Sequence, residues 1–179
     1  MEQDAYKNTV YWLKKLVDLG IPVPKVLFCG EYESYAYLIL DYIEGNDIGM
    51  VYENLTTAEK RQIAKEVIQI QRQVSALPLD KEMPQWTWYD FLNEMLDRAE
   101  IRIVQSGYFD KKSVVELRKQ IPLLNDYFLG IKPIAYLDDI STKNLLIHNG
   151  KLAGIIDVDW MGIGDNLTFI AMTYVALRN

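Results

Sequence analysis

Two adjacent segments decide the fold of this chain: Ala135-Tyr-Leu-Asp-Asp-Ile-Ser-Thr-Lys-Asn144 and Leu145-Leu-Ile-His-Asn-Gly-Lys-Leu-Ala-Gly-Ile-Ile-Asp157-Val-Asp-Trp160. The second segment contains two apolar runs, 145–147 and 152–156, on either side of Asn149-Gly150. Asn-Gly between apolar runs predicts a tight β-hairpin, because both central residues of a type I′ turn need a positive φ.

Oxygen-bearing side chains stand at both ends of this predicted hairpin. Asp138, Asp139 and Asn144 come before it, and Asp157 and Asp159 come directly after it. A hairpin returns to its starting edge, so we expect the acids and the amide to meet at one end. Carboxylate and amide oxygens suit Mg²⁺. The sequence therefore predicts a site for a hard cation at this end of the hairpin.

Bulk composition predicts one packed domain, or one domain with a fragment of another. The chain has 179 residues, of which 50% are hydrophobic and 12% aromatic, enough for a core. A net charge of −6 gives no support to nucleic-acid binding through phosphate contacts. No run reaches the roughly 18 apolar residues of a membrane span, and no leader pattern opens the chain. The lone cysteine, Cys29, is expected to be buried, and a chain without an internal disulfide fits the cytoplasm.

The first 45 residues predict one helix and two strands. Apolar residues recur at helical spacing through residues 4–20. Ile21-Pro-Val-Pro24 cannot continue a helix and leads in extended form into a strand at 25–30. A second strand is expected at 35–41, antiparallel to the first. We place a lobe boundary after Gly45.

The middle of the chain, from Asn54 to Gly130, predicts helices. Thr56 followed by Glu59 is a capping box, because side chain and backbone can satisfy each other's free donors at a helix start. One buried face of that helix is expected at Ile63, Val67, Ile70 and Val74. The expected helices cover residues 56–77, 87–107, 110–121 and 167–177, and Pro122 should interrupt the third.

The order of Asp139, Asn144 and Asp157, with the hairpin between the last two, is a recognisable arrangement. It resembles the catalytic core of the protein-kinase-like superfamily, and most closely its aminoglycoside phosphotransferase and choline kinase branch. The resemblance covers Tyr11–Asp165. Its other parts are a helix and Pro-rich entry strand at 12–13 and 21–26, a hinge at Tyr37-Leu-Ile-Leu-Asp-Tyr-Ile-Glu-Gly45, and Gly164-Asp165.

The resemblance implies an α+β protein-kinase-like fold, with a partial N-terminal lobe at residues 1–45 and a mostly helical C-terminal lobe at residues 46–179. It implies an ATP-dependent phosphotransferase that moves the γ-phosphate to a hydroxyl of a small molecule. By the same resemblance, Asp139 is the catalytic residue and Asn144 and Asp157 are the Mg²⁺ ligands. The residues implied to form the adenine pocket are Asp41, Tyr42, Ile43 and Ile156.

The chain departs from this family pattern before the catalytic Asp and at both ends. Leu137-Asp138 stands where the family has His-Gly, so Leu137 is expected to hold the loop by packing. The family's strand Lys, which reaches the phosphates, and its C-terminal helices have no counterpart in these 179 residues. We therefore expect a truncated form. Its bare N-lobe sheet edge would invite a second copy to form a homodimer.

Other interpretations stay open. A catalytically impaired pseudokinase, serving as a binding module, is favoured by these departures and opposed by the retained Asp139, Asn144 and Asp157. A metal-dependent hydrolase fits less well, because no second ligand cluster with His is present. The sole histidine, His148, is expected at the solvated hairpin turn. An antibiotic, choline, a sugar or a modified amino acid would each fit as acceptor, and an acidic chain suits a cationic one.

Overall fold

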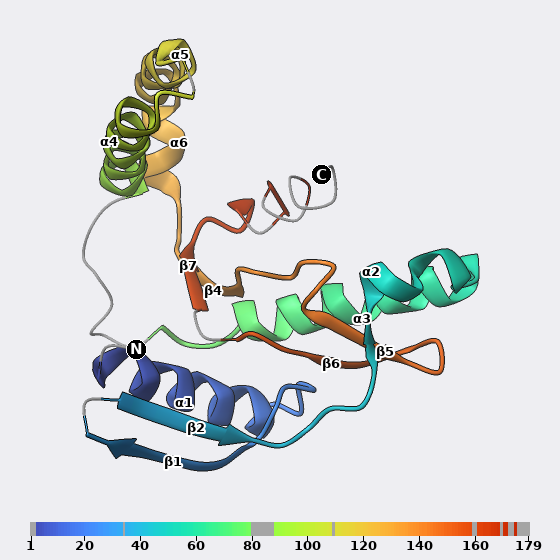
Figure 1. Cartoon of the computed structure of the whole chain (residues 1–179). Coiled ribbons are helices and arrows are strands. Elements are labelled where there is room, and N and C mark those ends of the chain that lie inside the picture. The colour runs from blue at the N-terminus through green and yellow to red at the C-terminus, as the bar shows by residue number, and fades with distance from the viewer. Residues whose placement is uncertain are drawn as a thin grey trace. The chain divides into compact units, whose positions relative to one another are not determined.

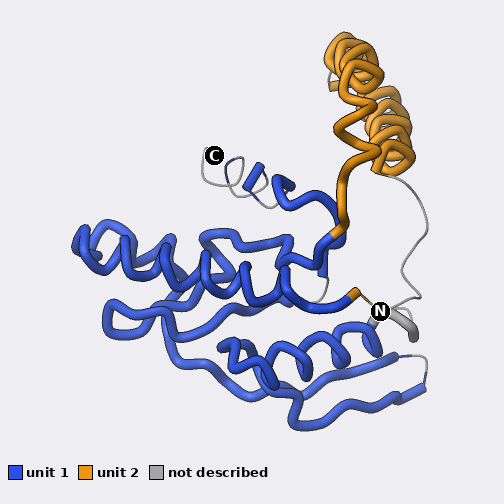
Figure 2. Tube along the Cα trace, turned by 180° about the vertical axis from the view of Figure 1, so that it is seen from behind, with its two compact units in different colours: residues 1–78, 134–179 blue, residues 79–133 orange. Residues whose placement is uncertain are grey.

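The computed structural model describes residues 3–33, 35–79, 88–108, 110–158, 161–168, 170, 171 and 174. These residues form helices and small antiparallel sheets (Figure 1). The chain divides into two compact units: residues 1–78 with 134–179 form unit 1, and residues 79–133 form unit 2 (Figure 2). Unit 2 is thus an insertion in the sequence of unit 1. The predicted α+β class is confirmed.

The described elements are as follows. Unit 1 contains α1 (Gln3–Asp18), β1 (Val26–Tyr32), β2 (Tyr35–Leu40), β3 (Asn46–Asp47), α2 (Ile48–Val51), the 3-10 helix η1 (Tyr52–Asn54), α3 (Thr57–Ser75), β4 (Ile134–Leu137), β5 (Leu145–His148), β6 (Lys151–Ile155) and β7 (Met161–Gly164). Unit 2 contains α4 (Trp88–Ser106), α5 (Lys112–Gln120), the 3-10 helix η2 (Ile121–Leu124) and α6 (Asn125–Gly130). Near the C-terminus, residues 168, 170, 171 and 174 are helical. Leu167, the predicted start of the last helix, lies in a turn. The remaining residues of the helix predicted at 167–177, and the helix start predicted at Thr87, lie outside the described residues.

The predicted hairpin is confirmed. Strands β5 and β6 pair antiparallel, with Leu145 opposite Ile155 and His148 opposite Lys151. Asn149 and Gly150 have φ values of 50° and 73°, as a type I′ turn requires. His148 is exposed beside this turn. Strand β3 pairs with the other edge of β5, which makes a three-stranded sheet.

Helix α3 begins as predicted and packs on the strands of the site. The Thr56 backbone N–H donates to Glu59 Oε2 at 2.8 Å, and the Glu59 backbone N–H donates to Thr56 Oγ1 at 3.3 Å, so both bonds of the capping box are present. The helix lies against β4 and β6. Its buried apolar side chains are Ile63, Ile70 and Val74.

Helix α1 and the β1–β2 pair form the N-terminal part of unit 1. The apolar face of α1 buries Trp12, Leu13 and Leu16. This part is joined to the hairpin, since the Ile155 N–H donates to Pro22 O at 2.8 Å. Cys29 is exposed, so its predicted burial is wrong. The two-stranded pair leaves much of its surface uncovered, and an apolar run does not show which side a helix covers.

Unit 2 is a group of helices that follows the predicted pattern. Helix α5 ends at Gln120, and Pro122 lies in the 3-10 turn η2, so the predicted interruption is confirmed. Arg118 on α5 forms ion pairs with Asp97 and Glu100 on α4. The buried apolar side chains of this unit include Val114, Ile121 and Phe128. In the described part of the chain, no helix combines the length and the apolar character that a bilayer crossing requires.

Candidate functional site

Residues 138–144 form a loop that leaves β4 and enters β5. Strand β4 is fixed by antiparallel pairing with β7, in which Leu137 lies opposite Met161. At the other end of the loop, Asn144 is 6% exposed. Its Nδ2 donates to the backbone oxygen of Asp139 at 3.0 Å. The loop is therefore closed on itself, and the side chain of Asn144 holds the backbone beside Asp139.

A crevice joins this loop to the segment that leaves the hairpin. The Ile156 N–H donates to Asn144 O at 2.9 Å, which brings Asp157 back toward the loop. The crevice holds about 10 Å³, close to the smallest space that accepts one water molecule. Its walls are Leu137, Asp138, Asp139, Ile140, Ile155, Ile156, Asp157 and Val158. Asp139 and Asp157 thus line one crevice, as predicted from the hairpin. The chemical roles of the two residues stay predictions. Asp159 lies outside the described residues.

The donor set around the crevice fits Mg²⁺. Because Nδ2 of Asn144 is bonded to Asp139 O, its Oδ1 is the amide atom that can act as a ligand. Asp157, which lines the crevice, supplies a carboxylate. Mg²⁺ takes few protein oxygens and completes its shell with water and phosphate oxygens. Two protein ligands of this kind are sufficient for Mg²⁺. A cluster of three or more His, Cys, Asp or Glu side chains arranged for a metal is absent from the described residues.

The residues predicted to line the adenine pocket are only partly brought together. Ile156 lines the crevice, and the side chain of Ile43 lies against Gly154 of β6. The Asp41 N–H donates to Lys25 O, and its carboxylate accepts from the Lys25 N–H, so both groups extend the β1–β2 pairing. Tyr42 is 86% exposed. It lines a separate polar hollow between the hinge and the hairpin turn.

The surroundings of the crevice are electronegative. Tyr136 on β4 is 6% exposed, and burial raises the pKa of its hydroxyl above the ordinary value. The carboxylates of Asp138 and Asp165 act in the same direction, and a hydrogen bond with Thr168 opposes them. The hydroxyl of Tyr136 thus stays neutral near the two carboxylates of Asp138 and Asp165. Such a site is favourable for a cation.

The profile of the phosphotransferase enzyme family, APH, matches residues 2–178. The chain belongs to this family. An aminoglycoside 3'-phosphotransferase of Niallia circulans is 27% identical over 169 residues, which cover 91% of this chain and 62% of that relative. This member of the phosphotransferase family thus spans about three fifths of the relative's length.

Solved structures show the same fold as this phosphotransferase-family chain. A GDP complex of an aminoglycoside 2'-phosphotransferase superposes with a TM-score of 0.70 at 17% identity, covering 92% of this chain and 59% of the other. A gentamicin complex of APH(2")-IIa gives a TM-score of 0.67 at 15% identity, covering 92% and 58%. The protein-kinase-like fold predicted from the sequence is confirmed.

Sequence reasoning missed one residue of the phosphotransferase-family site, Gln71. It lies on α3, is 3% exposed and bonds the backbone of Leu137. A signal was present, because Gln71 follows Val67 by four residues and precedes Val74 by three, on the predicted buried face. Leu137 is itself buried, so the loop is held by packing, as expected, and by this amide as well.

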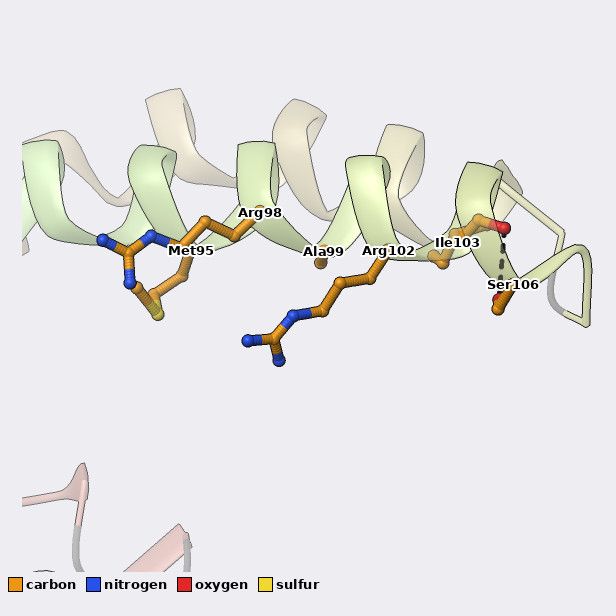
Figure 3. Close-up of a pocket in the computed structure, with 6 residues that line it drawn as sticks. All are labelled: Met95, Arg98, Ala99, Arg102, Ile103 and Ser106. Atoms are coloured by element: carbon orange, nitrogen blue, oxygen red, sulfur yellow. Dashed lines mark hydrogen bonds between the residues drawn. The ribbon is translucent and has the colours of Figure 1, made fainter. Parts of the chain in front are cut away.

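A larger hollow of about 420 Å³ lies on one side of α4 in unit 2 (Figure 3). It is lined by Met95, Arg98, Ala99, Arg102, Ile103 and Ser106. Two of these residues are arginines and none is acidic, although Arg98 also pairs with Glu94. This wall of guanidinium and apolar groups does not suit a cationic acceptor. The crevice in unit 1 therefore remains the candidate for the chemistry.

Proposed function

We propose that this chain carries the catalytic core of an ATP-dependent phosphotransferase, which transfers the γ-phosphate of ATP to a hydroxyl group of a small molecule. One observation carries the proposal: Asp139 and Asp157 line one crevice, and Asn144 is bonded to the backbone of Asp139. Family membership supports it. So does the shared fold with APH(2")-IIa, which is known in a ternary complex with streptomycin and ATP.

In this proposal, each polar group of the crevice has a separate task. Asp139 accepts or orients the proton of the acceptor hydroxyl, because a carboxylate within hydrogen-bond reach can act as a general base. Asn144 and Asp157 hold Mg²⁺, which when bound offsets the negative charge of the phosphates. The bond from Asn144 to Asp139 O keeps base and metal ligand in one fixed arrangement. Positioning of this kind is the main source of catalysis in phosphoryl transfer.

In this proposal, the adenine base binds between the two proposed lobes, residues 1–45 and 46–179. Ile156 contacts one face of adenine, and the hinge Asp41–Ile43 supplies backbone groups to its edge. The Asp41 N–H is already bonded to Lys25 O, so its carbonyl is the atom left for this purpose. Tyr42 and Ile43 complete the hinge side.

A phosphotransfer screen tests the function. The chain is incubated with Mg·ATP and a panel of aminoglycosides, amino alcohols and sugars, and phosphorylated acceptors are detected by mass spectrometry. Asp139→Asn is the blank, and we expect it to lower kcat by about 10²–10⁴-fold. Asp126→Asn is the matched control, because Asp126 is exposed on α6 and has no proposed catalytic role. Equal losses in both variants would contradict the assignment.

A nucleotide-binding module without transferase activity is the second candidate. It is favoured by Leu137, which stands at the family's His position. Saturable binding of Mg·ATP with no product from any acceptor in the screen would establish this candidate.

We also propose self-association and a cytoplasmic location. Among the described strands, β1 and β2 pair only with each other, which leaves edges that a second copy can extend. The single cysteine of the chain and its exposure fit a reducing compartment.

A further inference from the structure

Gln71 connects helix α3 to the strand that precedes the catalytic loop. Its Nε2 donates to the backbone oxygen of Leu137 at 2.8 Å. Its Oε1 accepts from the backbone N–H of the same residue at 3.0 Å. One side-chain amide thus satisfies both backbone groups of one residue, as the opposite residue of a hydrogen-bonded pair does in an antiparallel sheet.

Because this contact is buried, both of its hydrogen bonds must be formed within the protein. Gln71 is 3% exposed and Leu137 is also 3% exposed, so water cannot replace either bond. A buried backbone group without a partner is strongly disfavoured. The hydrogen bonds of Gln71 therefore fix the backbone of Leu137 relative to α3, in addition to the packing of the Leu137 side chain.

Leu137 is two residues before Asp139, and the other anchors of the loop lie further along. Asp139 O accepts from Asn144 Nδ2, and the Gly49 N–H donates to Thr142 O at 3.2 Å. These two bonds hold later parts of the loop, whereas the end of β4 is held by its pairing with β7, in which Leu137 lies opposite Met161. The Gln71 pair ties the same point to the long helix α3.

We infer that Gln71 is a positioning residue for catalysis: its amide sets the backbone from which the Asp139 carboxylate is presented to the acceptor. The inference rests on the proposed phosphotransferase function. Small displacements of a reacting group cost large factors in rate. Loss of the amide pair should therefore affect kcat while leaving nucleotide binding, which depends on other residues, nearly intact.

The first test compares Gln71→Met with Gln69→Met. Methionine keeps the length and volume of glutamine and removes both hydrogen bonds, and Gln69 is exposed on the same helix. In steady-state kinetics we expect kcat of Gln71→Met to fall by roughly 10–100-fold, with KM for ATP changed by less than about threefold. Gln69→Met should match the unsubstituted protein. Equal kcat in all three proteins would overturn the inference. A fall in kcat that only matches a loss of folded protein, with KM changed to the same extent, would overturn it as well.

The second variant, Gln71→Glu, is measured by the pH dependence of kcat. A residue with only a structural role would leave this pH dependence unchanged. A protonated carboxyl donates to Leu137 O and accepts from its N–H, whereas the ionised form cannot donate and buries a charge. Burial raises the pKa of the introduced acid, so the native contact is present at low pH and lost as pH rises. We expect the kcat of Gln71→Glu, divided by that of the unsubstituted protein at each pH, to recover as pH falls. A ratio that is flat with pH, as expected for Gln69→Glu, would overturn the inference.

Hydrogen–deuterium exchange separates this inference from the proposed function. Amide protection of a peptide spanning 134–140 should fall in Gln71→Met and remain in Gln69→Met, whether or not an acceptor is found. If the unsubstituted protein transfers phosphate to no acceptor, the proposed function fails, and a fall in protection still supports the anchoring of Leu137. If transfer occurs and protection is unchanged in Gln71→Met, the inference about Gln71 fails alone.

Discussion

At the scale of single residues, the most informative is Asp157. Its φ is 61°, in the left-handed region that Asp and Asn tolerate better than other side chains with a Cβ. The left-handed turn follows β6 and directs the chain back to the loop at Asp139. This position thus combines a proposed Mg²⁺ ligand with a left-handed backbone, and substitutions can separate the two.

Asp157→Asn should remove the charge and keep the backbone. In isothermal titration calorimetry with Mg·ATP we expect affinity to fall by roughly 10–100-fold, because one of two proposed Mg²⁺ ligands loses its charge. With EDTA present, ATP should bind both proteins equally, and the melting temperature should not change. Asp157→Val should in addition lower the melting temperature, since a β-branched residue is strained at positive φ. Unchanged Mg²⁺ dependence in Asp157→Asn would remove Asp157 from the proposed ligand set.

At the scale of elements, the start of α3 gives a pH-dependent stability. Hydrogen bonds from Thr56, first from its side chain and then from its backbone, lower the pKa of Glu59 below the ordinary 4.5. A carboxyl with a lowered folded pKa stabilises the fold above its unfolded pKa, and this contribution is lost as pH falls through the folded pKa.

Thr56→Ala should therefore lower the melting temperature by a few degrees near neutral pH, where the cap is intact. The difference from the unsubstituted protein should shrink as pH falls from 4.5 through the lowered folded pKa of Glu59, because below that pKa Glu59 is protonated in both proteins. Thr57→Ala, at the adjacent exposed threonine, is the control. Thermal unfolding followed by circular dichroism checks this, and a difference independent of pH would count against a stabilising role of the Glu59 charge.

The β4–β7 pair has no room for a larger residue at Gly162. A Cβ at this position would lie 2.1 Å from Cε2 of the buried Tyr136 ring, so the ring or the strand must move. We expect Gly162→Ala to destabilise the protein by about 1–3 kcal/mol, as overpacking usually does. Gly130→Ala is the control, because nothing lies within 4 Å of a Cβ there. Chemical denaturation measures both variants, and equal midpoints would show that the ring relaxes at little cost.

At the scale of the whole molecule, one face of the β1–β2 pair exposes large apolar side chains. Phe28 is 55% exposed and Tyr35 is 68% exposed, and the Phe28 ring stacks on Tyr37 at 6.0 Å between centroids. Uncovered aromatic clusters beside open strand edges are typical of association surfaces.

Sedimentation velocity over a tenfold concentration range should therefore show self-association. Ile39→Lys places a charge on the same face and should reduce it, because Ile39 lies opposite Phe28. Leu123→Lys is the matched control, since Leu123 is an exposed apolar residue of unit 2. A single monomeric species at all concentrations would argue against the proposed homodimer.

Local chemistry explains which features the sequence could predict. The hairpin follows from Asn149-Gly150, and the return of Asp157 to Asp139 follows from the hairpin. The β4–β7 pair joins segments without a shared turn, so no local signal announces it. Gln71 was missed for a similar reason: one glutamine on a polar helix is unremarkable until Leu137 is placed beside it. Cys29 was wrongly expected to be buried, because the coverage of a two-stranded pair depends on its neighbours.

The insertion of unit 2 also has a consequence for folding kinetics. Gln71 and Leu137 are 66 residues apart in sequence, and unit 2 lies between them. The hairpin can form alone within about 1–10 μs, whereas the α3–β4 contact must wait for the closure of this long loop. The loop-closure entropy grows only slowly with length, so replacing unit 2 by a linker of about 10 residues would recover only about 1 kcal/mol. The loop that carries Asp139 is thus a late-forming part of the chain, and its assembly sets the time at which a newly made molecule first has a complete crevice.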